Sequence, residues 1–378
     1  MSRSPWGKRI LSGCLIALLA LAVVSCMVFV VAGGLSSFVR DLGEKFIAQT
    51  PVIEQTPEPE FSGIEPVAGP QFTPVPIEFV FNEKSYTITP QVENDVYYGA
   101  LEIPRIVNGK EGMSDAQRYH DFYQRFTFDP AQTPAIENVV QQLRAIRDKR
   151  RLDMVAYAEL IIKYVQSVPY DASRLDDLKE GIVRQGDPRM PVQVLVDGTA
   201  DCDEKVMLAI ALLTHEGFDA TMFRYDEEKH MALGIKSEGS GYRDTGYEFV
   251  ELTGPGYVSE MPKELAGGIR LTSKPEELPF DSNGPYVYSQ RAVDEIAFIT
   301  HARDTALDAA ARKKAYVEST PMTQEQFDAE KAQFDACYTA YNTLQVTVDK
   351  DGRPTTDNVF KDRLSALKWL TQHYWWQE

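Results

Sequence analysis

The chain has 378 residues, of which 43% are hydrophobic and 25% are charged, a balance typical of globular proteins rather than of disordered chains or multi-span transporters. Its formal net charge of −17 argues against binding to nucleic acid or anionic lipid, because such binding starts from clustered lysine and arginine. At about 150 residues per domain, the length accommodates two soluble units and an anchor.

An uncharged apolar segment lies near the N-terminus. Residues 10–39 hold no charged side chain, and this run exceeds the roughly 20 apolar residues needed to cross a bilayer. Three basic residues precede it, so the positive-inside rule predicts a cytoplasmic N-terminus and an extracytoplasmic main domain. A cleaved signal peptide and lipid attachment at Cys26 are alternatives, but apolar residues continue beyond Cys26, which favours an uncleaved anchor. Residues 1–40 are therefore predicted to form a cytoplasmic tip and a transmembrane helix of a cell-membrane protein.

Proline is concentrated after this segment. Residues 51–77 contain repeated proline with few large apolar side chains, a composition that stays extended and cannot bury a core. We therefore expect residues 41–77 to form an extracytoplasmic linker, residues 78–265 to form the main domain, and residues 266–378 to form a helical region.

Strand and helix patterns follow the linker. Residues 77–89 alternate apolar and polar positions, which predicts strand structure at the start of the main domain. Two helices are expected next, one starting at Thr133 and one capped by Asp153, because apolar residues recur in both at helical spacing. An apolar helix then runs from Cys202 to a terminating Gly217.

Short strands and long helices complete the pattern. The apolar segments 220–225, 230–235 and 247–252 are separated by polar, glycine-containing loops and predict antiparallel strands. Three helices are expected from about residue 290 onward. The sequence therefore favours an α+β domain with a C-terminal helical extension.

Few cysteines are available for disulfides. Cys14 and Cys26 fall in the predicted span, so only Cys202 and Cys337 remain for the soluble part, which excludes a disulfide framework. A single bridge between these two stays open, as do a reactive thiol and an inert buried one.

Cys202 stands at the start of its predicted helix, where unpaired backbone N–H groups and the helix dipole favour a thiolate. Asp201, Asp203 and Glu204 act in the opposite direction, because negative neighbours raise the pKa of a thiol. A catalytic Cys202 therefore needs a basic partner. Without one, it is a small buried side chain.

His230 and Glu251 are candidates for that partner and its support. His230 begins a predicted strand on the face of Ala232 and Gly234, whose small size would let a helix end approach the imidazole. Glu251 ends the next strand, where its carboxylate could accept a hydrogen bond from the other imidazole nitrogen. Taken singly, His230 is as compatible with an exposed position and Glu251 with an ordinary surface glutamate. Their order after Cys202, on helix, strand and strand, is what unites them.

The segment around Cys202 resembles the nucleophile segment of transglutaminase-like proteins, in which a turn ending in Gly-Asp-Cys or Gly-x-x-x-Cys opens an apolar helix. Here that segment is residues 191–217, PVQVLVDGTADCDEKVMLAIALLTHEG. KHMALGI at 229–235 resembles the family's histidine strand, and YEFVELTGPG at 247–256 resembles its acid-bearing strand. The likeness is close over residues 150–262, looser over 78–150, and does not reach the C-terminal helices.

The resemblance implies a papain/transglutaminase-like core, in which a helix bearing Cys202 packs on an antiparallel sheet carrying His230 and Glu251. It implies that Cys202 is the nucleophile, His230 the general base and acid, and Glu251 the carboxylate that orients the imidazole. The implied reaction is hydrolysis or acyl transfer at an amide bond of an extracytoplasmic protein or peptide. One departure is Ala200, where the family usually has glycine before Asp-Cys. The alternative is a non-catalytic surface module of the same fold that binds a protein or cell-envelope partner.

Other chemistries have little support in the sequence. There is no phosphate-binding loop, and no Gly-x-Gly-x-x-Gly follows a strand. His215 and His230 have acidic neighbours, but no zinc-ligand spacing surrounds them. Neither a metal nor another cofactor is expected.

Overall fold

The computed structural model describes residues 63–105, 112–171, 173, 187–265, 268–344 and 362–374. The chain divides into two compact units, Met1–Phe61 and Ser62–Glu378. The predicted membrane span at residues 10–39 lies outside the described residues, as does the first part of the predicted linker. Within the described ranges, no helix combines the length and apolar character needed to cross a membrane.

Residues 63–76, which belong to the predicted linker, form no helix or strand but lie against the main domain. Ile64 is buried, and its backbone N–H donates to the carboxylate of Asp129 at 2.9 Å. Further along, the backbone N–H of Val75 donates to the carbonyl oxygen of Val196 at 3.4 Å. These contacts attach the segment to the domain ahead of the first strand.

The predicted strand at 77–89 is an antiparallel hairpin of β1 (Ile77–Phe81) and β2 (Lys84–Ile88). Asn82 and Glu83 form the connection, and both have positive φ, 46° and 60°. Two consecutive positive φ angles give the turn that matches the twist of a two-residue hairpin, so the apolar pattern is divided at this point.

Helices make up most of the domain before the four-stranded sheet, and α5 (Met154–Gln166) and α8 (Cys202–His215) are buried along most of their length. Asp153 caps the helix that follows it, because its side chain accepts the backbone N–H of Ala156 at 2.8 Å. Gly217, with φ of 85°, follows the end of the cysteine-bearing helix. The helices before the sheet are α2 (Asn94–Glu102), α3 (Asp115–Thr127), η1 (Pro130–Gln132), α4 (Thr133–Arg150), α5 (Met154–Gln166), α7 (Pro191–Asp197) and α8 (Cys202–His215).

A four-stranded antiparallel sheet follows, in the order β5-β4-β3-β6. Its strands are β3 (Ala220–Tyr225), β4 (His230–Lys236), β5 (Tyr247–Val250) and β6 (Glu276–Phe280), and the short helix η2 (Tyr242–Asp244) lies between β4 and β5. Three of these strands match the predicted segments. The fourth, β6, has the sequence EELPF, whose acids and Pro279 are unusual for a strand; it lies at the sheet edge, where proline is tolerated.

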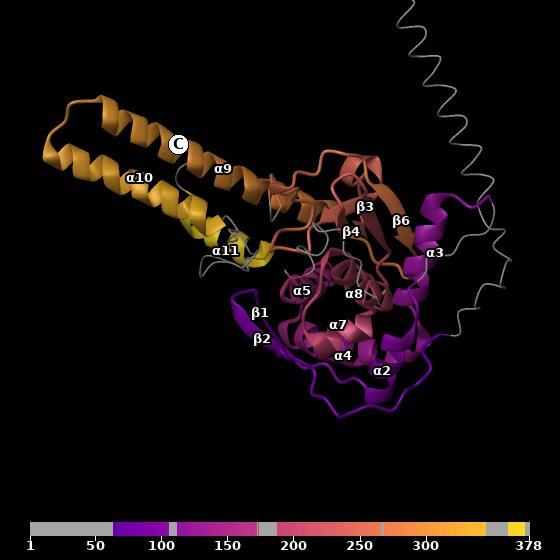
Figure 1. The fold of residues 1–378 in the computed structure, drawn as a ribbon. Helices are drawn as coiled ribbons and strands as arrows, with labels where there is room; N and C mark the ends of the chain where they lie inside the picture. The colour runs from indigo at the N-terminus through magenta and orange to yellow at the C-terminus, as the bar shows by residue number, and fades with distance from the viewer. Residues whose placement is uncertain are drawn as a thin grey trace, which may run out of the picture. The chain divides into compact units, whose positions relative to one another are not determined.

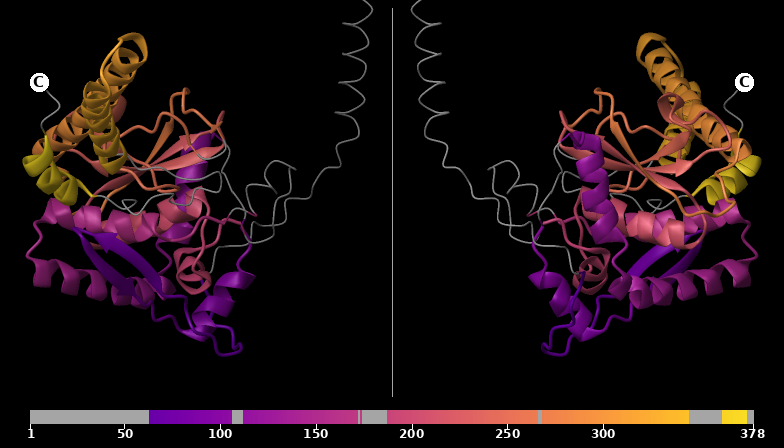
Figure 2. Two further views of the ribbon diagram at one scale, coloured as in Figure 1. Left: turned by 90° about the vertical axis from the view of Figure 1, so that its left-hand side faces the viewer. Right: turned by 90° about the vertical axis from the view of Figure 1, so that its right-hand side faces the viewer.

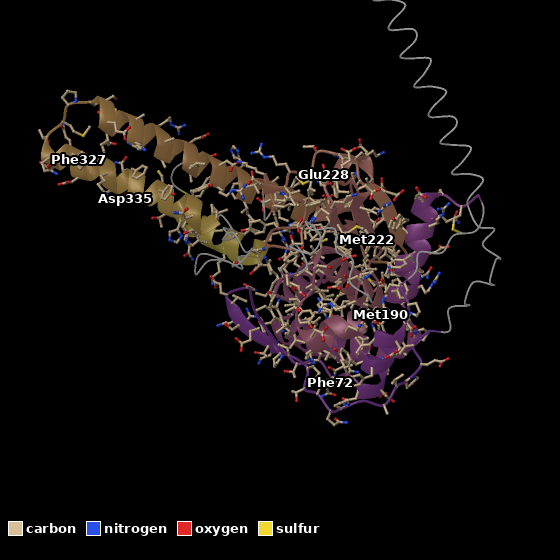
Figure 3. The ribbon with its side chains drawn as sticks, in the orientation of Figure 1. Phe72, Met190, Met222, Glu228, Phe327 and Asp335 are labelled. Atoms are coloured by element: carbon tan, nitrogen blue, oxygen red, sulfur yellow. The ribbon has the colours of Figure 1, made fainter. Side chains whose placement is uncertain are left out.

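The sheet and the helices are arranged in layers (Figure 1, Figure 2). The four-stranded sheet packs on one side of α5 and α8, while α4 and the β1–β2 hairpin lie on the other side, and α3 runs beside β6. Met222 of β3 lies in the packed interior, with none of its surface exposed (Figure 3). The fold class is therefore α+β, as the sequence predicts.

The small residues of β4 lie against aromatic rings. Ala232 packs in a cluster with Phe223 and Phe249, and a Cβ at Gly234 would come within 3.0 Å of the Phe223 ring. These positions make room for aromatic rings of the neighbouring strands β3 and β5. The contacts thus give these small residues a role in packing the aromatic rings, and the start of α8 touches the same strand at Met231.

Three helices follow the sheet: α9 (Gln290–Ser319), α10 (Gln324–Leu344) and α11 (Arg363–His373). α9 and α10 lie side by side, and the residues buried between them are small, which allows close approach of two helices: Ala302, Ala306, Ala309, Ala310, Cys337 and Ala340. Phe327 and Asp335 lie on α10, and the Phe327 ring is partly exposed (Figure 3).

The last of these helices is attached to the core by a buried ion pair. Nε of Arg363, on α11, lies 2.8 Å from Oε1 of Glu159, on α5. Tyr288 donates to the same oxygen at 2.6 Å, and Glu295 of α9 also binds the Arg363 guanidinium. The buried Glu159 carboxylate on α5 is thereby neutralised by an arginine of the C-terminal region.

Candidate functional site

The helix that carries Cys202 starts with a complete capping box. The side chain of Asp201 accepts the backbone N–H of Glu204 at 3.3 Å, and Glu204 in return accepts the backbone N–H of Asp201 at 3.0 Å. Both residues are buried. Because Cys202 is the first residue of α8, the box fixes the position at which the helix begins and hence that of the thiol.

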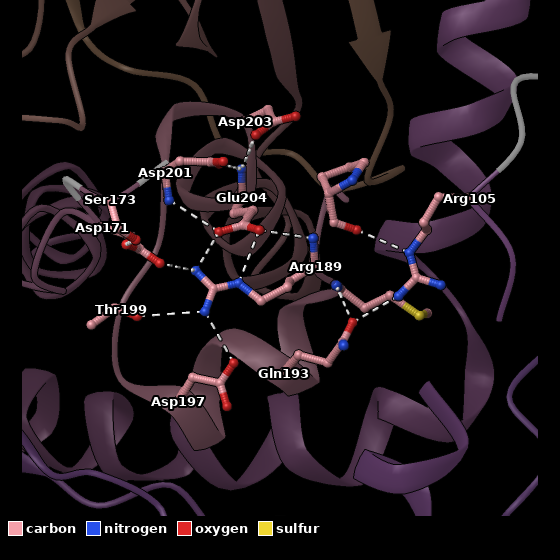
Figure 4. Close-up of polar contacts among 12 residues, drawn as sticks. Arg105, Asp171, Ser173, Arg189, Gln193, Asp197, Thr199, Asp201, Asp203 and Glu204 are labelled. Carbon is pink, nitrogen blue, oxygen red and sulfur yellow. Dashed lines mark hydrogen bonds and ion pairs between the residues drawn. The ribbon is translucent and has the colours of Figure 1, made fainter. Parts of the chain in front are cut away.

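Glu204 is held in turn by Arg189, a residue that the sequence analysis misses (Figure 4). Nε and Nη2 of Arg189 bind the two carboxylate oxygens at 3.0 and 2.7 Å, and the Arg189 backbone N–H donates to the same group at 2.8 Å. Burial lowers the pKa of Arg189, but Glu204 and Asp197 raise it by more, so the guanidinium stays charged. The signal in the sequence is the capping-box glutamate itself, since a carboxylate at a buried helix start requires a cation.

His230 and Glu251 are in contact. Nε2 of His230, the first residue of β4, lies 3.0 Å from Oε2 of Glu251, which directly follows the neighbouring strand β5. Both side chains are buried. Since a carboxylate only accepts, Nε2 carries a proton in this contact, and Nδ1 is free to act as the acceptor when the ring is neutral.

The Glu251 carboxylate is ionised in this environment. Burial alone would raise its pKa, but the charge and hydrogen bond of His230, together with Thr253, lower the pKa below its ordinary value. Thr253 donates to Oε1 from its backbone N–H at 2.7 Å and from its hydroxyl at 2.6 Å. Oε2 therefore accepts from the imidazole of His230, and Oε1 accepts from Thr253 in the loop that follows β5.

The Cys202 thiol lies against the histidine strand. The residue is half-buried, and the backbone N–H of Met231, next to His230, donates to its sulfur. Burial, then the charges of Asp203 and Asp201, raise the pKa of this thiol well above its ordinary value, and the Met231 N–H lowers it only in part. The resting cysteine is therefore a neutral thiol.

Two tyrosines border the thiol. Tyr123 of α3 donates from its hydroxyl to Asp203 at 3.4 Å, and burial followed by the charge of Asp203 raises its pKa well above the ordinary value. Tyr170 forms a bridge with Ala200, the residue that stands where transglutaminase-like proteins usually have glycine. Burial, together with the charges of Asp201 and Asp203, raises the pKa of Tyr170 also, so both hydroxyls remain protonated. Sequence reasoning gave neither residue a role.

A second pair of missed residues lies beneath the site. Lys205 follows Cys202 by three positions on α8, and Gln166 is the last residue of α5; both are buried. The available signal was a lysine directly before the apolar run VMLAIALL on a predicted buried helix, because ammonium groups are rarely buried without a partner.

His215, considered as a metal ligand, lies in an ion-pair cluster. Its Nε2 is 3.1 Å from Glu137, and its Nδ1 is 3.3 Å from Glu216. The hydrogen bond that His215 donates to Glu216 is the main reason that the pKa of His215 is raised. Across the residues that the structure describes, no three histidine, cysteine or acidic side chains stand close enough to hold a metal ion.

A groove borders the site on the side of Glu251. Its volume is about 710 Å³, and its walls are the loop of residues 255–264 and one face of α9, including Ile296 and Arg303. Glu248 and Glu251 line its floor. The C-terminal helices, to which the family resemblance does not extend, are thus neighbours of the candidate site.

Comparison of the chain with models of protein families, with curated proteins and with solved structures found no match. The assignment of a function therefore depends on the residues and their geometry.

Proposed function

We propose that this chain is a transglutaminase-like thiol enzyme with Cys202 as nucleophile, His230 as general base and acid, and Glu251 as the orienting carboxylate. The observation that carries the proposal is the buried contact of 3.0 Å between His230 and Glu251, beside a helix start whose cysteine accepts a hydrogen bond from the next residue of the histidine strand. A cysteine at a helix N-terminus, a histidine and an acid in this order are the parts that a papain-like core requires.

In this proposal, Nδ1 is the ring nitrogen that faces the thiol. Nδ1 is attached next to Cβ and is nearer to its own backbone than Nε2 is. The Cys202 sulfur accepts a hydrogen bond from the backbone N–H of Met231, the residue after His230, and Glu251 occupies Nε2, which leaves Nδ1 as the ring nitrogen that we assign to the thiol proton. The imidazole would then accept the thiol proton at Nδ1, and Glu251 would stabilise the imidazolium that results.

The proposed reaction begins with transfer of the thiol proton to Nδ1 and attack of the sulfur on an amide carbonyl carbon. The C–N bond then breaks, the imidazolium returns the proton to the departing amine, and a thioester on Cys202 remains. Water or a second amine next attacks the thioester and restores the thiol. We expect the amide to belong to a protein or peptide outside the cytoplasm.

A second candidate function is a non-catalytic module that binds a protein or cell-envelope partner. The observation in its favour is the raised pKa of Cys202, which Asp201 and Asp203 maintain. Such a thiol is a weak nucleophile unless His230 takes its proton during the reaction.

The pH dependence of Cys202 alkylation distinguishes the two. If His230 takes the proton, wild-type protein reacts with iodoacetamide at pH 6–7 faster than His230→Gln does, and the two profiles converge at high pH, where the thiol ionises alone. A Cys337→Ala background confines the label to one site of the soluble part. Identical profiles for wild type and His230→Gln would remove the basis for an enzyme and favour the module.

We also propose that residues 10–39 anchor the protein in the cell membrane with residues 41–378 outside the cytoplasm. The support is the uncharged span and its basic N-terminal flank. Protease added to intact cells or spheroplasts should then digest the domain. Complete protection until lysis would reverse the orientation.

A further inference from the structure

Lys205 connects three segments of the chain beneath the candidate site. It lies on the first turn of α8, and its ammonium donates to the carbonyl oxygen of Gln166 at 3.2 Å and to that of Leu252 at 3.0 Å. Gln166 ends α5, and Leu252 directly follows Glu251. One side chain therefore joins the nucleophile helix, the central helix and the end of the acid-bearing strand.

Gln166 completes this connection from the other side. Its Nε2 donates to the carbonyl oxygen of Glu251 at 2.8 Å and to that of Gly256 at 3.2 Å. The backbone carbonyls of Glu251 and Leu252 are thus bound by two different side chains. The Glu251 carboxylate is bound separately, by His230 and Thr253.

Both buried side chains are costly for folding. Lys205 is 1% exposed, and burial lowers its pKa to about 7, although the charge of Glu251 acts in the opposite direction. Gln166 is 5% exposed, and within the described part of the chain its Oε1 finds no hydrogen-bond partner. An apolar side chain of similar size would avoid both penalties, so packing does not explain these residues.

We propose that Lys205 and Gln166 are positioning residues for the site: they fix the main chain at Glu251 and Leu252, so that the carboxylate stays on His230 and in register with Cys202. This inference rests on the proposed function. Cys202 is three residues before Lys205 on one helix, so a movement of the strand end away from Lys205 is also a movement of Glu251 away from the nucleophile. Neither residue touches the reacting atoms.

A purely structural role for Lys205 would affect stability alone, so the test needs a readout on His230. The imidazole Nε2–H bound to Glu251 should give a downfield proton resonance that exchanges slowly with water and is absent from Glu251→Gln. We expect Lys205→Met to broaden or remove this resonance. The same variant should slow alkylation of Cys202 at pH 7 about tenfold, because a small displacement of positioned groups lowers the rate of the reaction that they assist. Gln166→Met should act in the same direction without changing the charge.

Lys163 provides the matched control. It is a second buried lysine, on α5, and burial lowers its pKa to about 8. Its ammonium is 3.4 Å from the carbonyl oxygen of Gly256 and has no hydrogen bond to the carbonyl of Glu251 or Leu252. Lys163→Met should therefore retain the resonance and the alkylation rate, even where its midpoint of unfolding falls as far as that of Lys205→Met.

The outcomes separate this inference from the proposed function. If wild-type alkylation is independent of His230, the proposed function fails, whatever Lys205→Met does. If wild-type alkylation depends on His230 but Lys205→Met and Gln166→Met both keep the resonance and the rate, the positioning role is wrong and the proposed function stands. Loss of both signals in Lys163→Met as well would overturn the positioning role in favour of general loosening. Should Lys205→Met not fold, Gln166→Met decides alone.

Discussion

Arg189 and Glu204 form a bidentate ion pair at the start of α8. Glu204 also accepts the backbone N–H of Asp201, the residue before Cys202. The start of α8 is therefore fixed by charge from outside the helix as well as by its own cap. Because Glu204 has no exposed surface, it depends on Arg189 for compensation of its charge.

Replacing Arg189 should destabilise the domain strongly. Arg189→Met removes the guanidinium that binds both oxygens of the buried Glu204 carboxylate, and we expect a loss of about 3–5 kcal/mol in the free energy of unfolding. Urea denaturation measures it. The control is Arg270→Met, which removes an exposed pair with Glu264 and should lose less than about 1 kcal/mol. Similar losses for both variants would contradict the supporting role of Arg189.

Activity and stability should separate at Cys202. Cys202→Ala is expected to abolish amide cleavage or acyl transfer while reducing the free energy of unfolding by about 1 kcal/mol, because a half-buried helix start is not a core cavity. Cys337→Ala, in the packed interface of α9 and α10, should lose about 1–2 kcal/mol and keep full activity. Peptide-release assays and thermal melts measure both. Activity that survives in Cys202→Ala but not in Cys337→Ala would show that Cys202 is not the nucleophile.

Removing one negative neighbour should increase the reactivity of the thiol. After burial, the charge of Asp203 is the largest cause of the raised pKa of Cys202. Asp203→Asn lowers that pKa, so the thiolate fraction at pH 7 rises and alkylation should become several times faster. Asp226→Asn, the same charge change at an exposed side chain, serves as the control. An unchanged or lower rate in Asp203→Asn would mean that the thiol is insulated from this carboxylate.

The pair of His230 and Glu251 should contribute an acid-sensitive part of the stability. The pKa of Glu251 is below its ordinary value of 4.5 in the folded chain, so its contribution is present above that pH and is lost as the pH falls through the folded pKa. The difference in unfolding free energy between wild type and Glu251→Gln should therefore shrink below about pH 4.5. Thr253→Val, which removes one hydrogen bond to Glu251, should show a smaller change of the same sign. A difference that stays constant between pH 6 and pH 3 would rule out the linkage.

Local patterns in the sequence predict much of the fold, but they do not predict the turn within the hairpin or the strand β6. The cysteine helix and the strands at 220–225 and 230–235 are found where periodicity places them. The sequence pattern predicts strand structure across the whole hairpin because the turn, at Asn82 and Glu83, lacks glycine. The strand β6 was missed because pairing with β3, rather than its own composition, makes it extended.

The candidate site was predictable only where chain order carries information. The antiparallel pairing of successive strands places the start of β4 beside the end of β5, so the contact between His230 and Glu251 follows from the order of the segments. The residues beneath them do not follow from it. Arg189 neutralises a carboxylate 15 positions away, and Lys205 binds backbone carbonyls, which every residue possesses and no sequence pattern marks.

Glu159 and Arg363, the pair that attaches α11 to α5, are 204 residues apart. A ribosome that adds about 5–20 residues per second makes the guanidinium roughly 10–40 s after the carboxylate that it neutralises. Throughout that interval the emerging chain has no partner from α11 for an acid in its central helix. The core therefore reaches its final form only after α11 has been synthesised, and a nascent chain interrupted before Arg363 would be delivered to chaperones and proteases as an unfinished domain.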